Sequence, residues 1–175
     1  MRTKDWKPTR LPGIFGLSKM TVAERKGLLI LIPQTGRILE IGTHSGATAT
    51  WLAKQRPRVQ FIGLDIFVAK DAAFGLPAVR NSQQCENYQI FVGTTTQFEK
   101  LNPAKFDLIV VDANHHYTPV LNDLQMAMPL LTPGGVLLAH DYTPNYPGVV
   151  RAVNKFTQAH HMTIELVADR LVRLR

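Results

Sequence analysis

Polar side chains that could move a proton gather directly after two apolar runs of the sequence. The first group is Asp112, Asn114, His115 and His116, and the second is His140 and Asp141. A histidine, with an ordinary pKa of about 6.5, can take the proton of a hydroxyl, and a divalent cation held by carboxylates can instead stabilise the alkoxide. The two groups therefore predict that a substrate hydroxyl is deprotonated with the help of a histidine, of a bound cation or of both.

A glycine-bearing loop and a more distant carboxylate indicate an adenosine-bearing cofactor. Gly42 and Gly46 bracket the loop after the apolar run 37–41, where they allow a tight turn and a close approach of the backbone to a ligand. Asp65 ends the next apolar run about 20 residues later, where a carboxylate accepts hydrogen bonds from both hydroxyls of a ribose. His44 stands where a pyrophosphate-binding loop has its second glycine, so the pattern favours an adenosine-bearing cofactor over a nicotinamide dinucleotide.

Short apolar runs, separated by intervals long enough for a helix, must position these groups. The predicted strands are 37–41, 60–64, 88–92, 106–111 and, after the turn Pro133-Gly134-Gly135, 136–139. Strands that alternate with helices form a parallel sheet, and ligands bind beyond the carboxyl ends of its strands. Asp112 and Asp141 follow two adjacent strands, so we expect them to converge on one site.

The remaining elements complete one domain. Thr21 and Glu24 have capping-box spacing at the start of a helix, and the predicted helices are 21–32, 47–55, 117–131 and 149–160. Residues 163–167 and 170–174 are predicted as a strand pair at the sheet edge. The expected fold class is α/β, a doubly wound (Rossmann-like), mostly parallel sheet with an antiparallel edge strand and helices on both faces. The domain spans residues 1–175, and residues 1–33 form an N-terminal segment and helix that could act as a lid.

Five blocks of sequence, in order, carry a resemblance to a known family. They are residues 39–46 (LEIGTHSG), 63–65 (GLD), 92–95 (VGTT), 106–117 (FDLIVVDANHHY) and 131–142 (LTPGGVLLAHDY). In these blocks the chain resembles the class I S-adenosylmethionine-dependent methyltransferases. It is most similar to small bacterial O-methyltransferases related to the catechol, caffeoyl-CoA and macrolide-sugar O-methyltransferases.

The resemblance implies a set of cofactor-binding residues. Glu40, Gly42 and Gly46 would cradle the methionine and ribose part, Asp65 would hold the ribose, and Ile66 with the Gly93-Thr94 turn would border the adenine. His44 and Asp112 complete the implied set. The family often carries an acidic residue where Thr94 stands and a glycine where His44 stands, so this chain departs from the pattern at both positions.

The resemblance also implies the catalytic residues. Asp112 and Asp141 match carboxylates that hold magnesium in metal-dependent relatives, and His115 matches a histidine that serves as base in some sugar methyltransferases. Relatives offer a carboxylate or amide as the third metal ligand, where this chain has His140. Magnesium prefers oxygen, so His140 either stays out of the coordination shell or shifts the site toward manganese, iron or zinc. A divalent cation, Mg or Mn, therefore remains an open expectation beside S-adenosylmethionine.

Composition and charge leave two alternatives open. The formal net charge is +7, but the basic residues are scattered, so a nucleic-acid methyltransferase or nucleic-acid-binding protein is an alternative that the sequence does not favour. A non-catalytic protein that binds the cofactor or a metal is the other. Cys85, the single cysteine, is expected to be a structural thiol. No apolar run approaches the ~20 residues that span a bilayer, and no secretory signal is visible, so we expect a cytoplasmic protein without membrane contact.

The sequence does not identify the methyl acceptor. We expect a small hydroxylated molecule, enclosed by residues 6–20 of the N-terminal segment and by the loop 142–148, which is rich in tyrosine and proline. A homodimer is compatible with the sequence.

Overall fold

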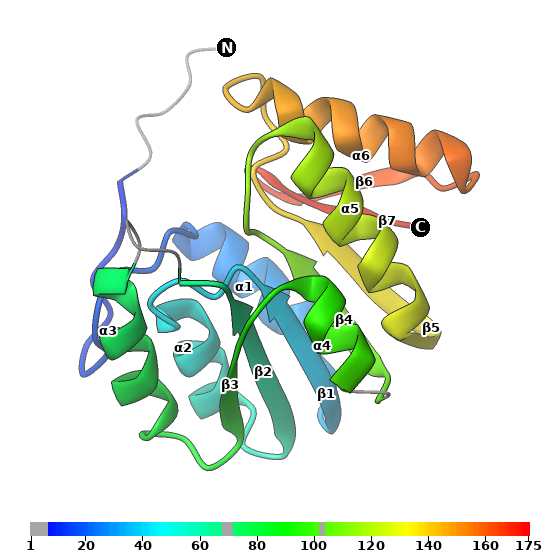
Figure 1. Cartoon of the computed structure of the whole chain (residues 1–175). Helices are drawn as coiled ribbons and strands as arrows, with labels where there is room; N and C mark the ends of the chain where they lie inside the picture. The colour runs from blue at the N-terminus through cyan, green and yellow to red at the C-terminus, as the bar shows by residue number, and fades with distance from the viewer. Residues whose placement is uncertain (1–6, 68–71, 102–103) are drawn as a thin grey trace.

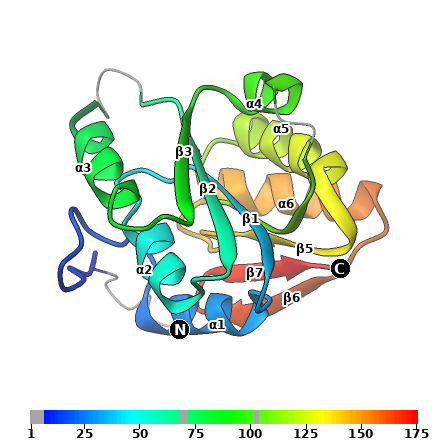
Figure 2. The same cartoon turned by 90° about the horizontal axis from the view of Figure 1, so that it is seen from below.

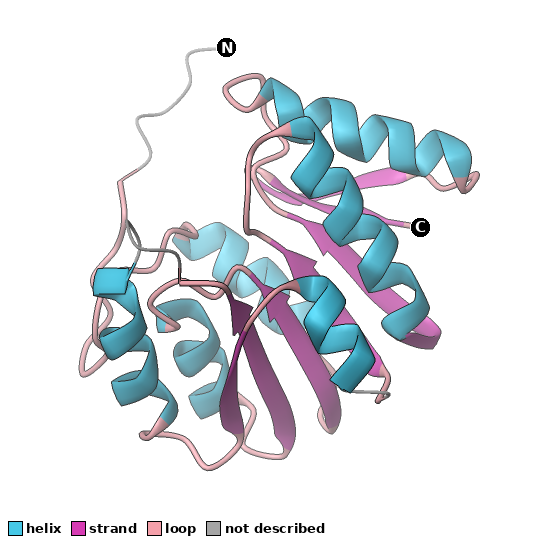
Figure 3. Cartoon of the chain, in the orientation of Figure 1, coloured by secondary structure: helices cyan, strands magenta, loops and turns pink. Residues whose placement is uncertain are grey.

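Seven strands form one sheet in the computed structural model, which describes residues 7–67, 72–101 and 104–175. The strands lie in the order β3-β2-β1-β4-β5-β7-β6 (Figures 1 and 3). They are β1 (Gly36–Ile41), β2 (Val59–Asp65), β3 (Tyr88–Val92), β4 (Phe106–Val111), β5 (Leu131–Ala139), β6 (Ile164–Ala168) and β7 (Leu171–Leu174).

The strand order reverses between β1 and β4. From β1 the chain moves outward through β2 to β3, then returns to the other side of β1 and continues through β4 to β5, and all of these neighbours pair in parallel. β7 pairs antiparallel with β5 and with β6. The predicted doubly wound sheet with an antiparallel edge is therefore confirmed, and its switch point lies where β1 and β4 end.

Helices cover both faces of the sheet, as Figure 2 shows from below. Alternate side chains of β1 explain why: Leu39 and Ile41 belong to the core beneath α4, α5 and α6, whereas Ile38 belongs to the core beneath α1 and α2. The helices are α1 (Val22–Leu31), α2 (Ala47–Gln55), α3 (Ala72–Ser82), α4 (Thr95–Leu101), α5 (Tyr117–Ala127) and α6 (Pro147–Ala159). Within the described ranges, none of the helices is long and apolar enough to cross a membrane.

The segment between α5 and β5 differs from the sequence prediction. The helix expected over 117–131 ends at Ala127, followed by a 3-10 turn (Met128–Leu130), and β5 begins at Leu131 rather than at residue 136. Pro129 lacks the backbone N–H that a continuing helix needs. The pairing with β4 is interrupted between residues 131 and 136, where the glycine-bearing turn bulges out of an otherwise continuous strand.

Gly42 permits the contact between the loops that follow β1 and β4. Its φ is +91°, and a Cβ atom there would lie 2.4 Å from both the Ala113 Cα and the Asp112 carbonyl oxygen. Backbone atoms of two packed loops cannot give way as a flexible side chain would. The absence of a side chain at this position therefore sets how closely the two loops approach.

We expect Gly42→Ala to lower the free energy of unfolding by about 2–4 kcal/mol, because it adds a steric clash to the strain of a positive φ. Gly134→Ala is the matched control: its φ is +79° and a Cβ there would meet no atom within 4 Å, so only the backbone strain of about 1–2 kcal/mol applies. Urea unfolding of both variants measures the difference. Equal losses would contradict the close approach of the two loops.

Candidate active site

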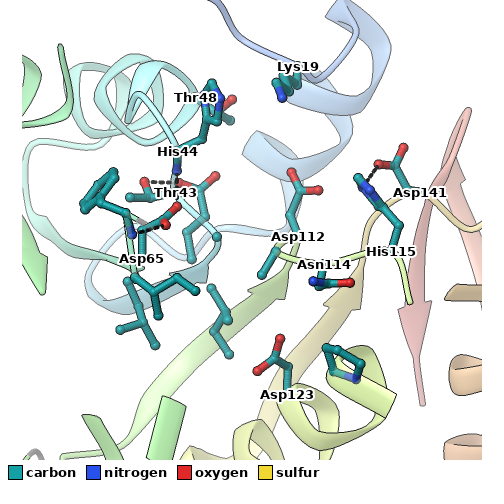
Figure 4. A pocket seen from close by; sticks show the side chains of 18 of the residues that line it. Lys19, Thr43, His44, Thr48, Asp65, Asp112, Asn114, His115, Asp123 and Asp141 are labelled. Atoms are coloured by element: carbon teal, nitrogen blue, oxygen red, sulfur yellow. Dashed lines mark hydrogen bonds and ion pairs between the residues drawn. The ribbon is translucent and has the colours of Figure 1, made fainter. Parts of the chain in front are cut away.

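A cleft of about 850 Å³ opens at the carboxyl ends of the parallel strands. Residues after β1, β2, β3, β4 and β5 line it, and its position is the switch point where ligands bind in such sheets. Figure 4 shows Asp65 and His44 on one side of the cleft and His115 and Asp141 on the other, with Asp112 between them. The predicted ribose-binding carboxylate, Asp65, and the predicted catalytic residues Asp112, His115 and Asp141 therefore line one cavity.

Asp65 is oriented by backbone donors. Its Oδ2 accepts a hydrogen bond from the His44 backbone N–H at 2.8 Å, and its Oδ1 accepts one from the Phe67 N–H at 3.0 Å. His44 has a φ of +51°, the conformation that explains why a glycine is frequent there. The carboxylate of Asp65 thus stands fixed at the edge of the cleft.

Glu40 lies at the cleft floor with 7% of its surface exposed. Its Oε2 accepts a hydrogen bond from the Thr43 hydroxyl at 2.6 Å, and Thr43 is also 2.8 Å from the Tyr88 hydroxyl. Burial raises the pKa of Glu40 from 4.5 to about 8, and the carboxylates of Asp112 and Asp65 add to this effect, against the Thr43 hydrogen bond, which lowers it. This end of the cleft therefore has an excess of acidic groups, which a cationic ligand would relieve.

Gly46 occupies a different place from the one expected. It is the N-cap of α2, and a Cβ there would lie 2.7 Å from the Tyr88 hydroxyl, behind the loop. The cleft itself is bordered by Gly42, His44 and the neighbours Ser45 and Ala47. A side chain at position 46 would thus press on Tyr88, which supports Glu40 through Thr43.

The opposite end of the cleft holds three groups with potential for acid-base or metal chemistry. Asp112, His115 and Asp141 offer ligand atoms that all lie within 4.8 Å of one another, which confirms that the two aspartates converge. His115 Nε2 is 2.8 Å from Asp141 Oδ2, and the His115 ring stacks on Tyr146 with 4.3 Å between centroids. The imidazole is therefore held by a carboxylate at its edge and by an aromatic ring on its face.

His140 lies behind this cluster and does not line the cleft. It is 3% exposed, with Nδ1 at 2.9 Å from Asp112 Oδ1 and Nε2 at 3.2 Å from Glu24 Oε2. Burial lowers the pKa of His140, but the charge and hydrogen bond of Asp112 and the contact with Glu24 outweigh it and raise the pKa to about 10. Both ring nitrogens thus face carboxylates, and His140 contacts Asp112 and Asp141 from outside the cleft.

Glu24 and Arg170, which the sequence did not single out for the site, anchor this arrangement. Glu24 is fully buried, and its Oε1 accepts hydrogen bonds from the Arg170 backbone N–H at 3.0 Å and from Arg170 Nε at 3.2 Å. Arg170 Nη1 donates to Asp141 Oδ1. Burial raises the pKa of Glu24, but His140, the Thr21 N–H and Arg170 together lower it to about 2. The capping-box spacing of Thr21 and Glu24 was the one signal that could have pointed to Glu24.

The other expected site residues fall into three groups. Ile66, Gly93, Thr94, Asn114 and His116 line the cleft, as do Pro8, Leu17 and Lys19 of the N-terminal segment and Tyr146 of the loop before α6. Tyr142 faces α6, where its hydroxyl donates to Asn154 Oδ1 at 2.8 Å. Trp6, at the start of the expected lid, lies outside the described residues.

Comparison with known proteins identifies the family. A family model described as a methyltransferase domain matches residues 39–142, more than half of the chain, so the chain belongs to this family. The matched region contains Gly42, Asp65, Asp112 and His115 and ends just after Asp141. A search of curated protein sequences found no match.

Solved structures share the fold. The O-methyltransferase TomG from Streptomyces achromogenes, solved with SAM, is 22% identical with a TM-score of 0.65, over 89% of this chain and 81% of that chain. An O-methyltransferase from Bacillus cereus, solved with SAH, is 18% identical with a TM-score of 0.68, over 89% and 81%. A ribosomal protein L11 methylase from Lactobacillus delbrueckii subsp. bulgaricus is 21% identical with a TM-score of 0.58, over 85% and 73%.

We expect Glu24→Gln to lower the free energy of unfolding at pH 7 by about 3–5 kcal/mol, because it removes one partner from a buried network of charges. The folded-state pKa of Glu24 is depressed, so its contribution is complete above pH 4.5 and is lost as the pH falls toward 2. Urea unfolding at pH 7 and pH 3 should therefore show a smaller difference between variant and wild type at the lower pH.

Glu165→Gln is the matched control for this experiment. Glu165 pairs with Arg175 at 3.2 Å on the surface, where about half of each side chain is exposed, so its loss should be worth under about 1 kcal/mol at either pH. A loss for Glu24→Gln as small as that of the control would contradict the role of Glu24 as an anchor.

Proposed function

We propose that this methyltransferase transfers the methyl group of S-adenosylmethionine to a hydroxyl of a small molecule, with His115 as general base. The observation that carries the proposal is that a fixed carboxylate suited to a ribose, Asp65, and a carboxylate-oriented imidazole, His115, border the same cleft. S-adenosylmethionine supplies an activated methyl group on a sulfonium. The protein then has to align the acceptor and remove its proton.

The residues around Asp65 fit this cofactor. Asp65 can accept hydrogen bonds from ribose hydroxyls in addition to those from its backbone donors, since a carboxylate has about four acceptor sites. Glu40, Asp65 and Asp112 line the cleft, and burial, together with the charges of Asp112 and Asp65, raises the pKa of Glu40. A sulfonium and an ammonium group are the cations that this acidic lining would stabilise.

His115 and Asp141 supply the base. When Nε2–H of His115 donates to Asp141, the neutral imidazole carries its lone pair on Nδ1. Nδ1 is then the atom that takes the hydroxyl proton of the methyl acceptor. Asp141 stabilises the imidazolium that results, and burial of Asp141 is outweighed by His115, His140 and Arg170, which lower its pKa. Asp141 therefore stays ionised while His115 takes up the proton.

Metal assistance is the second candidate mechanism, because Asp112, His115 and Asp141 can reach one ion. A divalent cation bound there would stabilise the deprotonated acceptor, and two oxygens with one nitrogen suit manganese, iron or zinc better than magnesium. His140 and Arg170, however, already contact Asp112 and Asp141 and offset much of their charge. This balance of charges favours the histidine base.

The lining of the cleft also favours a small acceptor over a nucleic acid. Besides the acidic residues already described, Asp123 contributes a carboxylate, which repels phosphate groups. The N-terminal segment contributes Leu17 and Lys19, and the loop before α6 contributes Tyr146. We propose that these two segments enclose the acceptor.

We expect Asp65→Ala to weaken binding of S-adenosylmethionine about ten- to a hundredfold, because hydrogen bonds to a charged acceptor are lost. Isothermal titration calorimetry measures the affinity. Asp169→Ala is the control, since Asp169 is exposed and, among the described residues, accepts a hydrogen bond from the Thr21 hydroxyl, away from the cleft. Equal affinities of the two variants would contradict the assignment of the ribose site.

We expect Asp141→Asn to lower kcat by about 10²–10⁴-fold while the affinity for S-adenosylmethionine stays within about threefold, because Asp141 acts on the acceptor side. A mass-spectrometric screen of phenols and sugars for methyl transfer provides the substrate. Wild-type turnover should survive EDTA. Loss of turnover in EDTA that manganese restores would establish the metal-assisted mechanism instead, and full activity of Asp141→Asn would contradict both.

A further inference from the structure

Asp123 is a half-buried carboxylate on the wall of the cleft that the mechanism above does not use. It lies on α5 and lines the cleft together with Gly93, Thr94 and Thr95. Figure 4 shows its side chain on the side of the cleft away from Lys19, below Asp112 and Asn114. Its place is distinct from that of His115 and Asp141.

This wall is the adenine end of the cleft under the proposed function, on which the inference rests. With the ribose at Asp65, the base extends toward Ile66 and toward the turn after β3, which both line the cleft. Asp123 reaches this turn from α5, because its carboxylate contacts Thr95. A carboxylate is therefore presented to the edge of the base.

Thr94, which stands where the family often has an acidic residue, is occupied otherwise. Its N–H and its hydroxyl contact Gln97 Oε1 at 2.9 and 3.2 Å, and the Gln97 N–H donates back to its hydroxyl at 3.2 Å. This reciprocal cap of α4 uses the polar groups of Thr94 locally. Thr94, which was expected to border the adenine, thus has few polar groups left to hydrogen-bond a ligand.

Asp123, in contrast, retains an oxygen for a ligand. The Thr95 hydroxyl donates to its Oδ1 at 3.0 Å, which fixes the carboxylate, and no residue in the described part of the chain donates to Oδ2. Burial raises the pKa of Asp123 to about 6, against the Thr95 hydrogen bond, which lowers it. Asp123 is therefore mainly ionised at neutral pH and acts only as an acceptor.

We infer that the Asp123 carboxylate accepts a hydrogen bond from the exocyclic amino group of the cofactor's adenine and selects a 6-amino purine over a 6-oxo purine. An amino group donates to a carboxylate, whereas a carbonyl oxygen in the same place would face it with like partial charge. A site that leaves a buried polar group without its partner discriminates strongly against the wrong ligand. Asp123 takes on, from α5, the recognition that Thr94 does not provide.

The test compares S-adenosylhomocysteine with S-inosylhomocysteine, which carries a 6-oxo group, by isothermal titration calorimetry at pH 7.5. The wild type should bind the adenosyl compound at least about tenfold more tightly. Asp123→Asn should reduce this ratio to about threefold or less, because the amide NH2 that replaces Oδ2 can donate to a 6-oxo group but cannot accept from a 6-amino group. The carboxamide oxygen still accepts from Thr95, so the variant keeps the contact between α4 and α5.

Asp107→Asn is the matched control, since Asp107 also accepts from a threonine hydroxyl, that of Thr132 at 3.3 Å, but does not line the cleft. Its ligand preference should equal that of the wild type. A wild type that binds both compounds equally, or an Asp123→Asn variant that keeps the full preference, would overturn the inference and leave the proposed function standing. A wild type that binds neither compound would overturn both.

Discussion

The candidate active site depends most on the contacts that the buried Glu24 carboxylate makes with two cationic side chains. It lies on α1, outside the cleft, yet it contacts His140 at the end of β5 and Arg170 in the turn between β6 and β7. His140 in turn contacts Asp112, and Arg170 contacts Asp141. One side chain thus sets the position of both aspartates through two cations, and a charge that would be costly to bury alone is compensated from both sides.

The two ends of the cleft are held in place by different kinds of interaction. Under the proposed function, the cofactor end is built from tight turns after β1 and β2 and from backbone donors to Asp65, so its shape depends on local backbone geometry. The acceptor end is built from side chains of distant segments, held by charge. Sequence changes at the acceptor end can therefore alter chemistry while the cofactor end stays intact, provided that the charges still balance.

The extent to which the sequence predicts this site follows from how local each interaction is. The convergence of Asp112 and Asp141 follows from the rule that carboxyl ends of parallel strands share one edge, and it is confirmed. The contacts of Glu24 with Arg170 join positions 146 residues apart, across an antiparallel edge whose register no local pattern specifies. The orientation of His140 likewise depends on which carboxylates surround it, so its burial behind Asp112, outside the cleft, could not be predicted.

The acidic lining of the cleft also bears on how a turnover ends. Transfer of the methyl group converts a sulfonium into a neutral thioether, so the bound cofactor loses one positive charge at the moment of reaction. Under the proposed function, the carboxylates of Asp65 and Asp112 attract the charged form more than the neutral one, in a cleft set within a protein whose net charge is +7. The carboxylates that line the cleft therefore distinguish the charged cofactor from its neutral product by electrostatics.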